Sequence, residues 1–235
     1  MHTVERAIIL AAGTGTRMLP VTRFIPKPLV PVNGTPMIET VIRALYENDI
    51  TEIHIVVGYL KEQFEVLVER YPGVRLIENP LYREWNNISS LYAAREILSN
   101  CIILDGDQII RNPQILDKRF ERSGYNAVWT QTETTEWLLE LENGVVCGCS
   151  RTGGSRGWQL YSISRWSESD CKKLRKHLET EFAQGNKTIY WDDLALFCYP
   201  NDYALGIRKM ERNDVIEIDS LRELIEVDPS YSLYK

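Results

Sequence analysis

The stretch "ILAAGTGTRMLPVTRFIPKPLVPV", Ile9 to Val32, decides the fold class. It begins as an apolar strand and passes directly into a loop with two glycines, an arginine and a lysine between two prolines. A loop that follows the first strand of an open α/β sheet is the usual place for a ligand. Gly13 and Gly15 permit close backbone approach, and successive amide groups there can bind phosphate oxygens. We therefore expect an α/β fold with a phosphate site at this loop.

The two cations of the loop favour a triphosphate as the ligand. Arg17 offers a planar fork of donors to phosphate, and Lys27 offers a mobile point charge. Pro26 and Pro28 restrict the chain beside Lys27, which limits the entropy lost in placing it. The sequence excludes a Rossmann G-x-G-x-x-G, because Met18 stands in place of the third glycine, and it lacks the Gly-Lys-Ser/Thr of a P-loop. A glycine-rich turn with solvated cations is the simpler alternative.

Apolar strands alternate with amphipathic helices along the first half of the chain. The predicted strands are 6–12, 52–58, 74–78 and 101–105, and the predicted helices are 36–48, 61–71 and 88–98. This alternation predicts a mainly parallel sheet covered by helices on both faces.

The pattern changes after about residue 126, where short strand-like runs are separated by Gly, Asn and Ser. They predict a small antiparallel extension over about 126–166. The later predicted elements are helices 167–184, 192–198 and 221–225 and strands 203–209 and 215–218. We expect one domain over 1–226, and a tail, 227–235, that is a frayed end or a linker to a further enzyme.

Composition excludes several classes of function. The 235 residues carry a net charge of -6, which argues against a general nucleic-acid binder. No apolar run reaches the length of roughly 18–20 residues that a membrane span needs, and no signal peptide is visible. Five cysteines without disulfide spacing favour a reducing cytoplasm. Cys147 and Cys149 lack the partners of a zinc site, and no role is assigned to them.

Two pairs of acids end predicted strands far apart in the sequence. Asp105 and Asp107 lie on one face at the end of the predicted strand 101–105. Glu217 and Asp219 have the same spacing in "DVIEIDS". Mg²⁺ prefers one or two carboxylates together with phosphate oxygens of the substrate. These acids can therefore meet over a triphosphate. The alternative is a turn acid at Asp105 and a helix cap at Asp219.

The motifs together resemble a known family. The string "LAAGTGTRMLPVTRFIPKPLVPVNGTPMIE" resembles the signature of nucleotidyltransferases that make nucleoside-diphosphate sugars and alcohols. Within that superfamily, the chain is similar to bacterial CTP:phosphocholine cytidylyltransferases in "VVGYLKEQFE", "NPLYREWNNISSLY", "TEWLL", "YWDD" and "IEIDS". The resemblance covers residues 5–224. It implies a Rossmann-like α/β/α sandwich with a small β extension that binds the acceptor.

The resemblance also implies roles for particular residues. It assigns Mg²⁺ to Asp107 and Asp219 and catalysis to Arg17 and Lys27. The implied nucleotide-binding residues are Leu10, Ala12, Gly13, Thr14, Gly15, Asn87, Ser90 and Asp105. The implied acceptor-binding residues are Glu136, Trp137, Tyr190, Trp191 and Asp192. In the implied reaction, an anionic phosphate oxygen attacks the α-phosphorus of CTP and pyrophosphate leaves, so catalysis consists of positioning and charge neutralisation.

The acceptor is the least constrained part of this prediction. Aromatic faces beside acids suit an alkylated ammonium, which favours phosphocholine and CDP-choline as product. Asp193 stands where phosphocholine relatives tend to carry Asn, and an additional acid favours a primary ammonium, as in 2-aminoethylphosphonate or phosphoethanolamine. The sequence is also compatible with a sugar-1-phosphate nucleotidyltransferase and with a non-catalytic nucleotide sensor. The residues alone do not separate CTP from UTP or dTTP.

Overall fold

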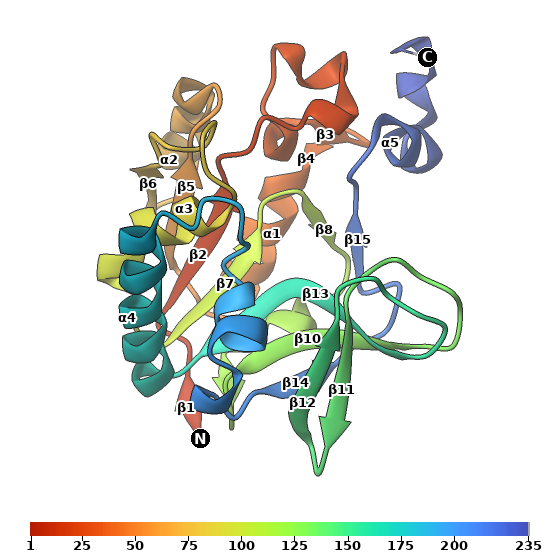
Figure 1. Ribbon diagram of the computed structural model, residues 1–235. Helices are drawn as coiled ribbons and strands as arrows, with labels where there is room; N and C mark the ends of the chain where they lie inside the picture. The colour runs from red at the N-terminus through yellow and green to blue at the C-terminus, as the bar shows by residue number, and fades with distance from the viewer. Residues whose placement is uncertain (235) are drawn as a thin grey trace.

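A computed structural model describes residues 1–234 of the protein (Figure 1). Its main sheet has nine strands in the order β12-β11-β13-β7-β2-β5-β6, with β10 paired to β13 and to β14. The strands are β2 (Arg6–Ala11), β5 (Glu52–Val57), β6 (Val74–Glu78), β7 (Cys101–Asp105), β10 (Gly124–Thr130), β11 (Leu138–Glu142), β12 (Val145–Ser150), β13 (Gly157–Trp166) and β14 (Gly206–Lys209). β7, β2, β5 and β6 are parallel, and β13 joins them antiparallel to β7. The predicted fold class is confirmed.

Helices cover both faces of this sheet. They are α1 (Met37–Glu47), α2 (Glu65–Arg70), α3 (Ile88–Ala93), α4 (Glu168–Gln184) and α5 (Leu221–Val227). Side chains alternate along β2, so that Ile9 faces a core cluster shared with α1 and α2, and Ile8 faces a second cluster shared with α3 and α4. The protein is therefore a three-layer α/β/α sandwich (Figure 1).

Three short ladders lie outside the main sheet. They pair β1 (His2–Thr3) with β9 (Arg119–Phe120), β3 (Pro31–Val32) with β4 (Thr35–Pro36), and β8 (Gln108–Ile110) with β15 (Val215–Glu217). The 3₁₀ turns are η1 (Thr16–Met18), η2 (Val21–Arg23), η3 (Lys27–Leu29), η4 (Lys61–Phe64), η5 (Arg95–Ile97), η6 (Pro113–Leu116), η8 (Pro200–Asp202) and η9 (Pro229–Tyr234), and η7 (Leu194–Cys198) is a π-helix.

Several predicted elements differ in detail from the structure. The predicted helix 61–71 begins as the 3₁₀ turn η4 and becomes α2 only at Glu65, and the predicted helix 88–98 ends at Ala93 before η5. The short helix predicted at 192–198 is a π-helix from Leu194. The predicted strand 203–209 begins only at Gly206, where it pairs in parallel with β10. Hydrophobic periodicity predicts where a helix or strand lies more accurately than it predicts the residues at which the element begins and ends.

The tail does not fray within the residues that the structure describes, which disagrees with one of its two expected alternatives, the frayed end. The backbone amide of Asn33 donates to Asp228 at 2.8 Å, and the Tyr231 hydroxyl donates to the carbonyl of Pro31 at 2.7 Å. Tyr231 also packs against a small core cluster that contains Met18. Residues 227–234 are thus held against the segment that follows the glycine loop by hydrogen bonds and packing. Residue 235 lies outside the described residues.

The fold brings the expected site to one edge of the sheet. β2 lies between β5 and β7, and all three parallel strands end at the same edge, where the glycine loop follows β2 and Asp105 ends β7. Such an edge is where open α/β sheets bind ligands. In residues 1–234, no helix combines the length and the apolar character required to cross a membrane.

Candidate active site

The glycine loop is built around a left-handed residue. Gly15 has φ 62°, and a Cβ there would lie 2.9 Å from the Cβ of Lys27 and 3.1 Å from Thr22 Cγ2. Thr22 holds the turn, because its hydroxyl donates to the Gly15 carbonyl at 2.8 Å. Gly15 therefore serves both conformation and close packing. A Cβ at Gly13 would meet no atom within 4 Å, so Gly13 borders open space that a ligand can use.

Lys27 is the centre of the site. Its side chain is buried, and its Nζ lies 2.5 Å from Asp107 Oδ2 and 2.7 Å from Asp219 Oδ1. Arg17 Nη2 lies 3.0 Å from the same oxygen of Asp219. Burial favours the neutral amine, but the two carboxylates outweigh it and raise the pKa of Lys27 above its ordinary value. All four residues predicted to act in catalysis or metal binding thus meet at one point.

Asp219 is not a helix cap, although it directly precedes α5. Ser220 is the N-cap, its hydroxyl accepts from the Glu223 amide, and Glu223 completes a capping box. The Asp219 carboxylate is free to face the cations. Burial raises the pKa of Asp219, but Lys27 and Arg17 outweigh this effect and lower it overall.

Two further acids stand beside this centre. Burial and the charge of Asp107 raise the pKa of Asp105 well above its usual range. Burial, together with Asp107 and Asp219, raises the pKa of Glu217 to about 8, and Gln108 Nε2 donates to Glu217 at 2.7 Å. This concentration of acids favours a cationic ligand.

The carboxylates of Asp107 and Asp219 fit a magnesium ion that also binds substrate phosphate. Both bond to the same ammonium of Lys27, so their oxygens converge on one cation. Mg²⁺ commonly takes one or two carboxylates plus phosphate oxygens. Within residues 1–234, His, Cys, Asp and Glu side chains form no group of three or more that could hold a metal without such oxygens.

A pocket of about 270 Å³ lies against the glycine loop. Eight of the residues predicted to bind nucleotide or to act in catalysis line it, namely Leu10, Gly13, Gly15, Arg17, Lys27, Asn87, Ser90 and Asp105, as do the predicted metal ligands Asp107 and Asp219. Ala12 is buried beside it, where its carbonyl accepts from the Tyr59 amide at 3.1 Å, and Thr14 is half-buried in the loop. All of the predicted nucleotide residues except Ala12 and Thr14 therefore line one pocket.

Hydrogen bonds hold the segment between β6 and α3 in place. Asn79 Nδ2 donates to the hydroxyls of Ser89 and Ser90 at 2.9 and 3.1 Å, and Asn87 Oδ1 accepts from the Trp191 amide at 2.9 Å. The last bond joins the nucleotide pocket to the "YWDD" segment. Asn79 was not predicted from the sequence. Its position, ten and eleven residues before two adjacent serines, is the signal that could have indicated a buried polar network.

A second pocket, of about 320 Å³, adjoins the first and contains the predicted acceptor residues except Trp191. It is lined by Glu136, Trp137, Leu160, Ser162, Tyr190, Asp192 and Glu217 together with Arg17, Asn87, Asp105, Asp107 and Asp219. Trp137 and Tyr190 meet edge to face, with ring centroids 5.7 Å apart and planes at 82°. Burial raises the pKa of Glu136. Sequence reasoning had not assigned Leu160, Ser162 or Glu217 to this pocket.

Asp192 is the most deeply buried acid of this second pocket. Burial, with the charge of Asp193, raises the pKa of Asp192 to about 7. Its Oδ1 is buried and lacks a hydrogen bond of good geometry. The buried Tyr125 hydroxyl, which also lacks one, interacts with this carboxyl and lowers its pKa against the effect of burial. Buried acceptors are nearly always paired, so this oxygen can accept from Tyr125 after a small shift or from a donor that a ligand supplies.

Two expectations about "YWDD" require correction. Trp191 does not face the acceptor pocket, because its ring is buried against Tyr125 and Trp166, with centroids 6.3 and 5.9 Å away. Asp193, the acid expected to distinguish the head group, is buried and forms an ion pair with Arg151 at 2.6 Å. Its second oxygen accepts from the Tyr190 amide at 2.8 Å, so Asp193 holds the loop rather than the ligand.

Comparison with known proteins agrees with this geometry. The profile of the MobA-like NTP transferase domain matches residues 7–189. The chain belongs to this family. It is 40% identical over 228 residues to a 2-aminoethylphosphonate cytidylyltransferase of Lancefieldella rimae, a match that covers 96% of this chain and 92% of that one. It is 36% identical over 219 residues to a choline-phosphate cytidylyltransferase of Streptococcus pneumoniae, covering 93% and 94%.

A solved structure has the same fold over nearly its whole length. The CTP:phosphocholine cytidylyltransferase from Streptococcus pneumoniae superimposes with a TM-score of 0.90 at 34% identity, covering 97% of this chain and 99% of that one. The protein is thus an enzyme of the nucleotidyltransferase class, and these relatives, matched over nearly their whole length, are cytidylyltransferases by name. The relatives differ in their acceptor.

Proposed function

We propose that this enzyme transfers CMP from CTP to a phosphorus-bound oxygen of a small acceptor that carries a cationic amine, and that pyrophosphate is released. The convergence of Lys27, Arg17, Asp107 and Asp219 at the carboxyl ends of β2 and β7 supports a triphosphate site. The adjoining pocket is lined by acids and two aromatic rings, which suits a small cation.

The chemistry requires positioning and charge neutralisation more than proton transfer. A phosphate or phosphonate oxygen is largely anionic near neutral pH, so no general base is needed. The amides of the glycine loop and Arg17 hold the leaving phosphates, and Lys27 draws the α-phosphate and the anionic acceptor together. Asp107 and Asp219 would hold Mg²⁺, which neutralises charge on the phosphates when bound.

The structure favours 2-aminoethylphosphonate as the acceptor, and the observation that carries this choice is the buried carboxyl of Asp192 in the acceptor pocket, whose Oδ1 lacks a hydrogen bond of good geometry. A primary ammonium donates N–H bonds, so it satisfies this oxygen and can also reach Glu136 or Glu217 in the same pocket. A trimethylammonium group has no N–H to donate and adds no hydrogen bond to this oxygen, a difference of about 1–3 kcal/mol. The relative with 40% identity acts, by its name, on 2-aminoethylphosphonate.

Phosphocholine is the second candidate, because Trp137 and Tyr190 form two walls of a corner at 82°. Such walls bind alkylated ammonium groups by cation–π attraction. Trp191 does not supply a third wall, because it is buried in the core.

A pyrophosphate-release assay tests the proposal. With CTP and Mg²⁺, we expect kcat/KM for 2-aminoethylphosphonate to exceed that for phosphocholine by about tenfold or more, which is the value of one well-placed hydrogen bond. UTP, dTTP and ATP replace CTP in parallel reactions. A preference for phosphocholine would refute the acceptor, and activity with UTP but not CTP would refute the cytidylyltransferase itself.

A further inference from the structure

A basic pocket lies at the opposite end of the sheet from the active site. Its volume is about 700 Å³, larger than either pocket at the carboxyl ends of the strands. Four arginines line it, Arg119, Arg122, Arg165 and Arg208, against two acids, Asp117 and Glu121. It shares no lining residue with the two active-site pockets. An excess of cations on a chain of net charge -6 is a local feature that requires its own explanation.

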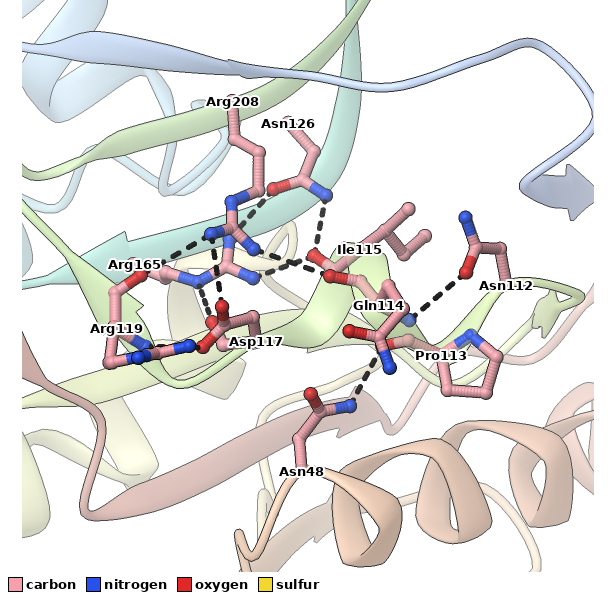
Figure 2. A network of polar contacts seen from close by, with 10 residues as sticks. All are labelled: Asn48, Asn112, Pro113, Gln114, Ile115, Asp117, Arg119, Asn126, Arg165 and Arg208. Atoms are coloured by element: carbon pink, nitrogen blue, oxygen red, sulfur yellow. Dashed lines mark hydrogen bonds and ion pairs between the residues drawn. The ribbon is translucent and has the colours of Figure 1, made fainter.

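Arg165 is the unusual member of this group, because it is a buried cation without a counterion. Only 3% of the residue is exposed. Its guanidinium donates to three uncharged acceptors, the carbonyls of Asp117 and Ile115 at 3.0 and 2.6 Å and Asn126 Oδ1 at 2.8 Å (Figure 2). Within residues 1–234, no carboxylate forms an ion pair with it, and charges so deeply buried are normally paired.

The electrostatic balance around Arg165 is unfavourable to its charge. Burial, followed by the neighbouring charge of Arg208, lowers the pKa of Arg165 to about 9. The carboxylate of Asp117 forms ion pairs with Arg119 at 3.5 Å and with Arg208 at 3.8 Å, so it is already shared (Figure 2). Backbone and side-chain bonds from Arg119 help to lower the pKa of Asp117. The Asp117 carboxylate is therefore shared among three guanidinium groups, and Glu121, the other acid of the pocket, forms no ion pair within residues 1–234.

The outer arginines leave donors for a ligand. Arg208 is held at 3.4 and 3.3 Å by the carbonyls of Gln114 and Arg119, and Arg122 donates to the carbonyl of Gly144 at 3.3 Å. Arg119 and Arg122 are exposed. Each guanidinium has five N–H groups, and these contacts use only a few of them.

We propose that this arginine pocket is a second ligand site that binds a small phosphate-bearing anion. Planar guanidinium forks match phosphate oxygens in pairs, and several of them around one cavity favour a polyanion over a single carboxylate. A volume of about 700 Å³ accommodates inorganic pyrophosphate or the phosphates of a nucleotide. An anion there supplies the counterion that Arg165 lacks.

Binding of inorganic pyrophosphate, measured by calorimetry without Mg²⁺, tests the site. For the native chain we expect two binding events, one at the glycine loop and one at the arginine pocket. Arg119→Ala combined with Arg208→Ala should weaken one event by about 30-fold or more, since charge-assisted hydrogen bonds are lost. Arg17→Met should weaken the other event and leave the pocket event unchanged.

A matched control removes two positive charges elsewhere. Lys172→Ala combined with Arg175→Ala, on the exposed face of α4, should leave both events unchanged. The proposal is overturned if the Arg119/Arg208 variant retains both events, or if the α4 variant loses affinity equally. Both variants change exposed or partly exposed side chains, and circular dichroism should confirm that they fold.

A competition arm identifies the source of the phosphate groups. CTP is titrated into the Arg17→Met chain, and pyrophosphate follows. Loss of the pocket event in the presence of CTP assigns the site to a nucleotide, and its persistence assigns it to a free inorganic anion; either outcome supports a phosphate site. The proposal is overturned if pyrophosphate binds neither to the native chain nor to the Arg17→Met chain.

Discussion

The ammonium of Lys27 lies 2.7 Å from the carboxylate of Asp219, although 192 residues separate them in the sequence. Asp107, from the turn between β7 and β8, bonds to the same ammonium. The three side chains come from three different segments, so the fold rather than local sequence produces the contact. A lysine between the two proposed metal acids places phosphate capture and metal binding within hydrogen-bonding distance of each other.

Asp219→Asn should abolish most of the turnover without unfolding the chain. The change removes a proposed metal ligand and one partner of Lys27 and Arg17, and a lost ligand costs at least about 100-fold in kcat. Asp107→Asn should act alike. Steady-state kinetics with varied Mg²⁺ measure the effect, and Glu226→Gln on the exposed face of α5 is the control. A kcat within about threefold of the native value would remove Asp219 from the site.

Lys27→Met should lower mainly kcat, because the charge that Lys27 neutralises peaks as the acceptor approaches the α-phosphorus. Arg17→Met should also weaken CTP binding, since it holds phosphates that are present in the ground state. Initial rates and CTP affinity by calorimetry separate the two effects. If both variants change only the KM for the acceptor, the assigned roles are wrong.

Acceptor binding should depend on the charge of Asp192. The titratable groups near it are Asp105, Asp193, Tyr125 and Cys149, and burial raises the pKa of Asp192 to about 7. The carboxyl is ionised above that pH and protonated below it. The KM for 2-aminoethylphosphonate should therefore rise by about tenfold as the pH falls from about 8 to about 6.

The phosphonate group of the acceptor also titrates in this range, so a control is needed. Asp192→Asn retains that titration and removes only the carboxylate. It should raise the KM at the higher pH and flatten the profile. An unchanged slope in the Asn variant would show that Asp192 does not cause the pH dependence, which would then lie with the acceptor or with Glu217.

Arg151→Ala should destabilise the chain and loosen the acceptor loop. It leaves Asp193 buried without its ion pair, at a cost of about 2 kcal/mol, which corresponds to a Tm roughly 4–8 °C lower. Because Asp193 also holds the Tyr190 amide, the KM for the acceptor should rise more than that for CTP. Asp193→Asn added to Arg151→Ala should recover part of the stability, and additive losses would deny the coupling.

The sequence predicted the parts of this protein whose chemistry is local. A few neighbouring residues were enough to indicate the glycine loop, Lys27 between its prolines, and the two acids at strand ends. The mainly parallel sheet also follows from the alternation of strands and helices. These features required no knowledge of distant contacts.

Features that depend on tertiary packing were missed. In "YWDD", nothing local shows that Tyr190 lines the pocket while Trp191 packs against Tyr125 and Trp166. The partner of Asp193 lies 42 residues away at Arg151, directly after β12. Likewise, the arginines of the basic pocket are spread from residue 119 to residue 208 and form no motif.

The contact of Lys27 with two carboxylates has a consequence for the ionic strength dependence of binding. Arg17 and Lys27 carry two positive charges, and Asp107 and Asp219 two negative ones, so the ligand-free centre is neutral by itself. The lysine occupies the position that a counterion from solution would otherwise take. When magnesium and triphosphate enter together, one set of ion pairs is exchanged for another, and few ions are released to the solvent. Affinity for the magnesium nucleotide should then vary little with added salt, in contrast to sites that attract phosphate through an uncompensated positive field.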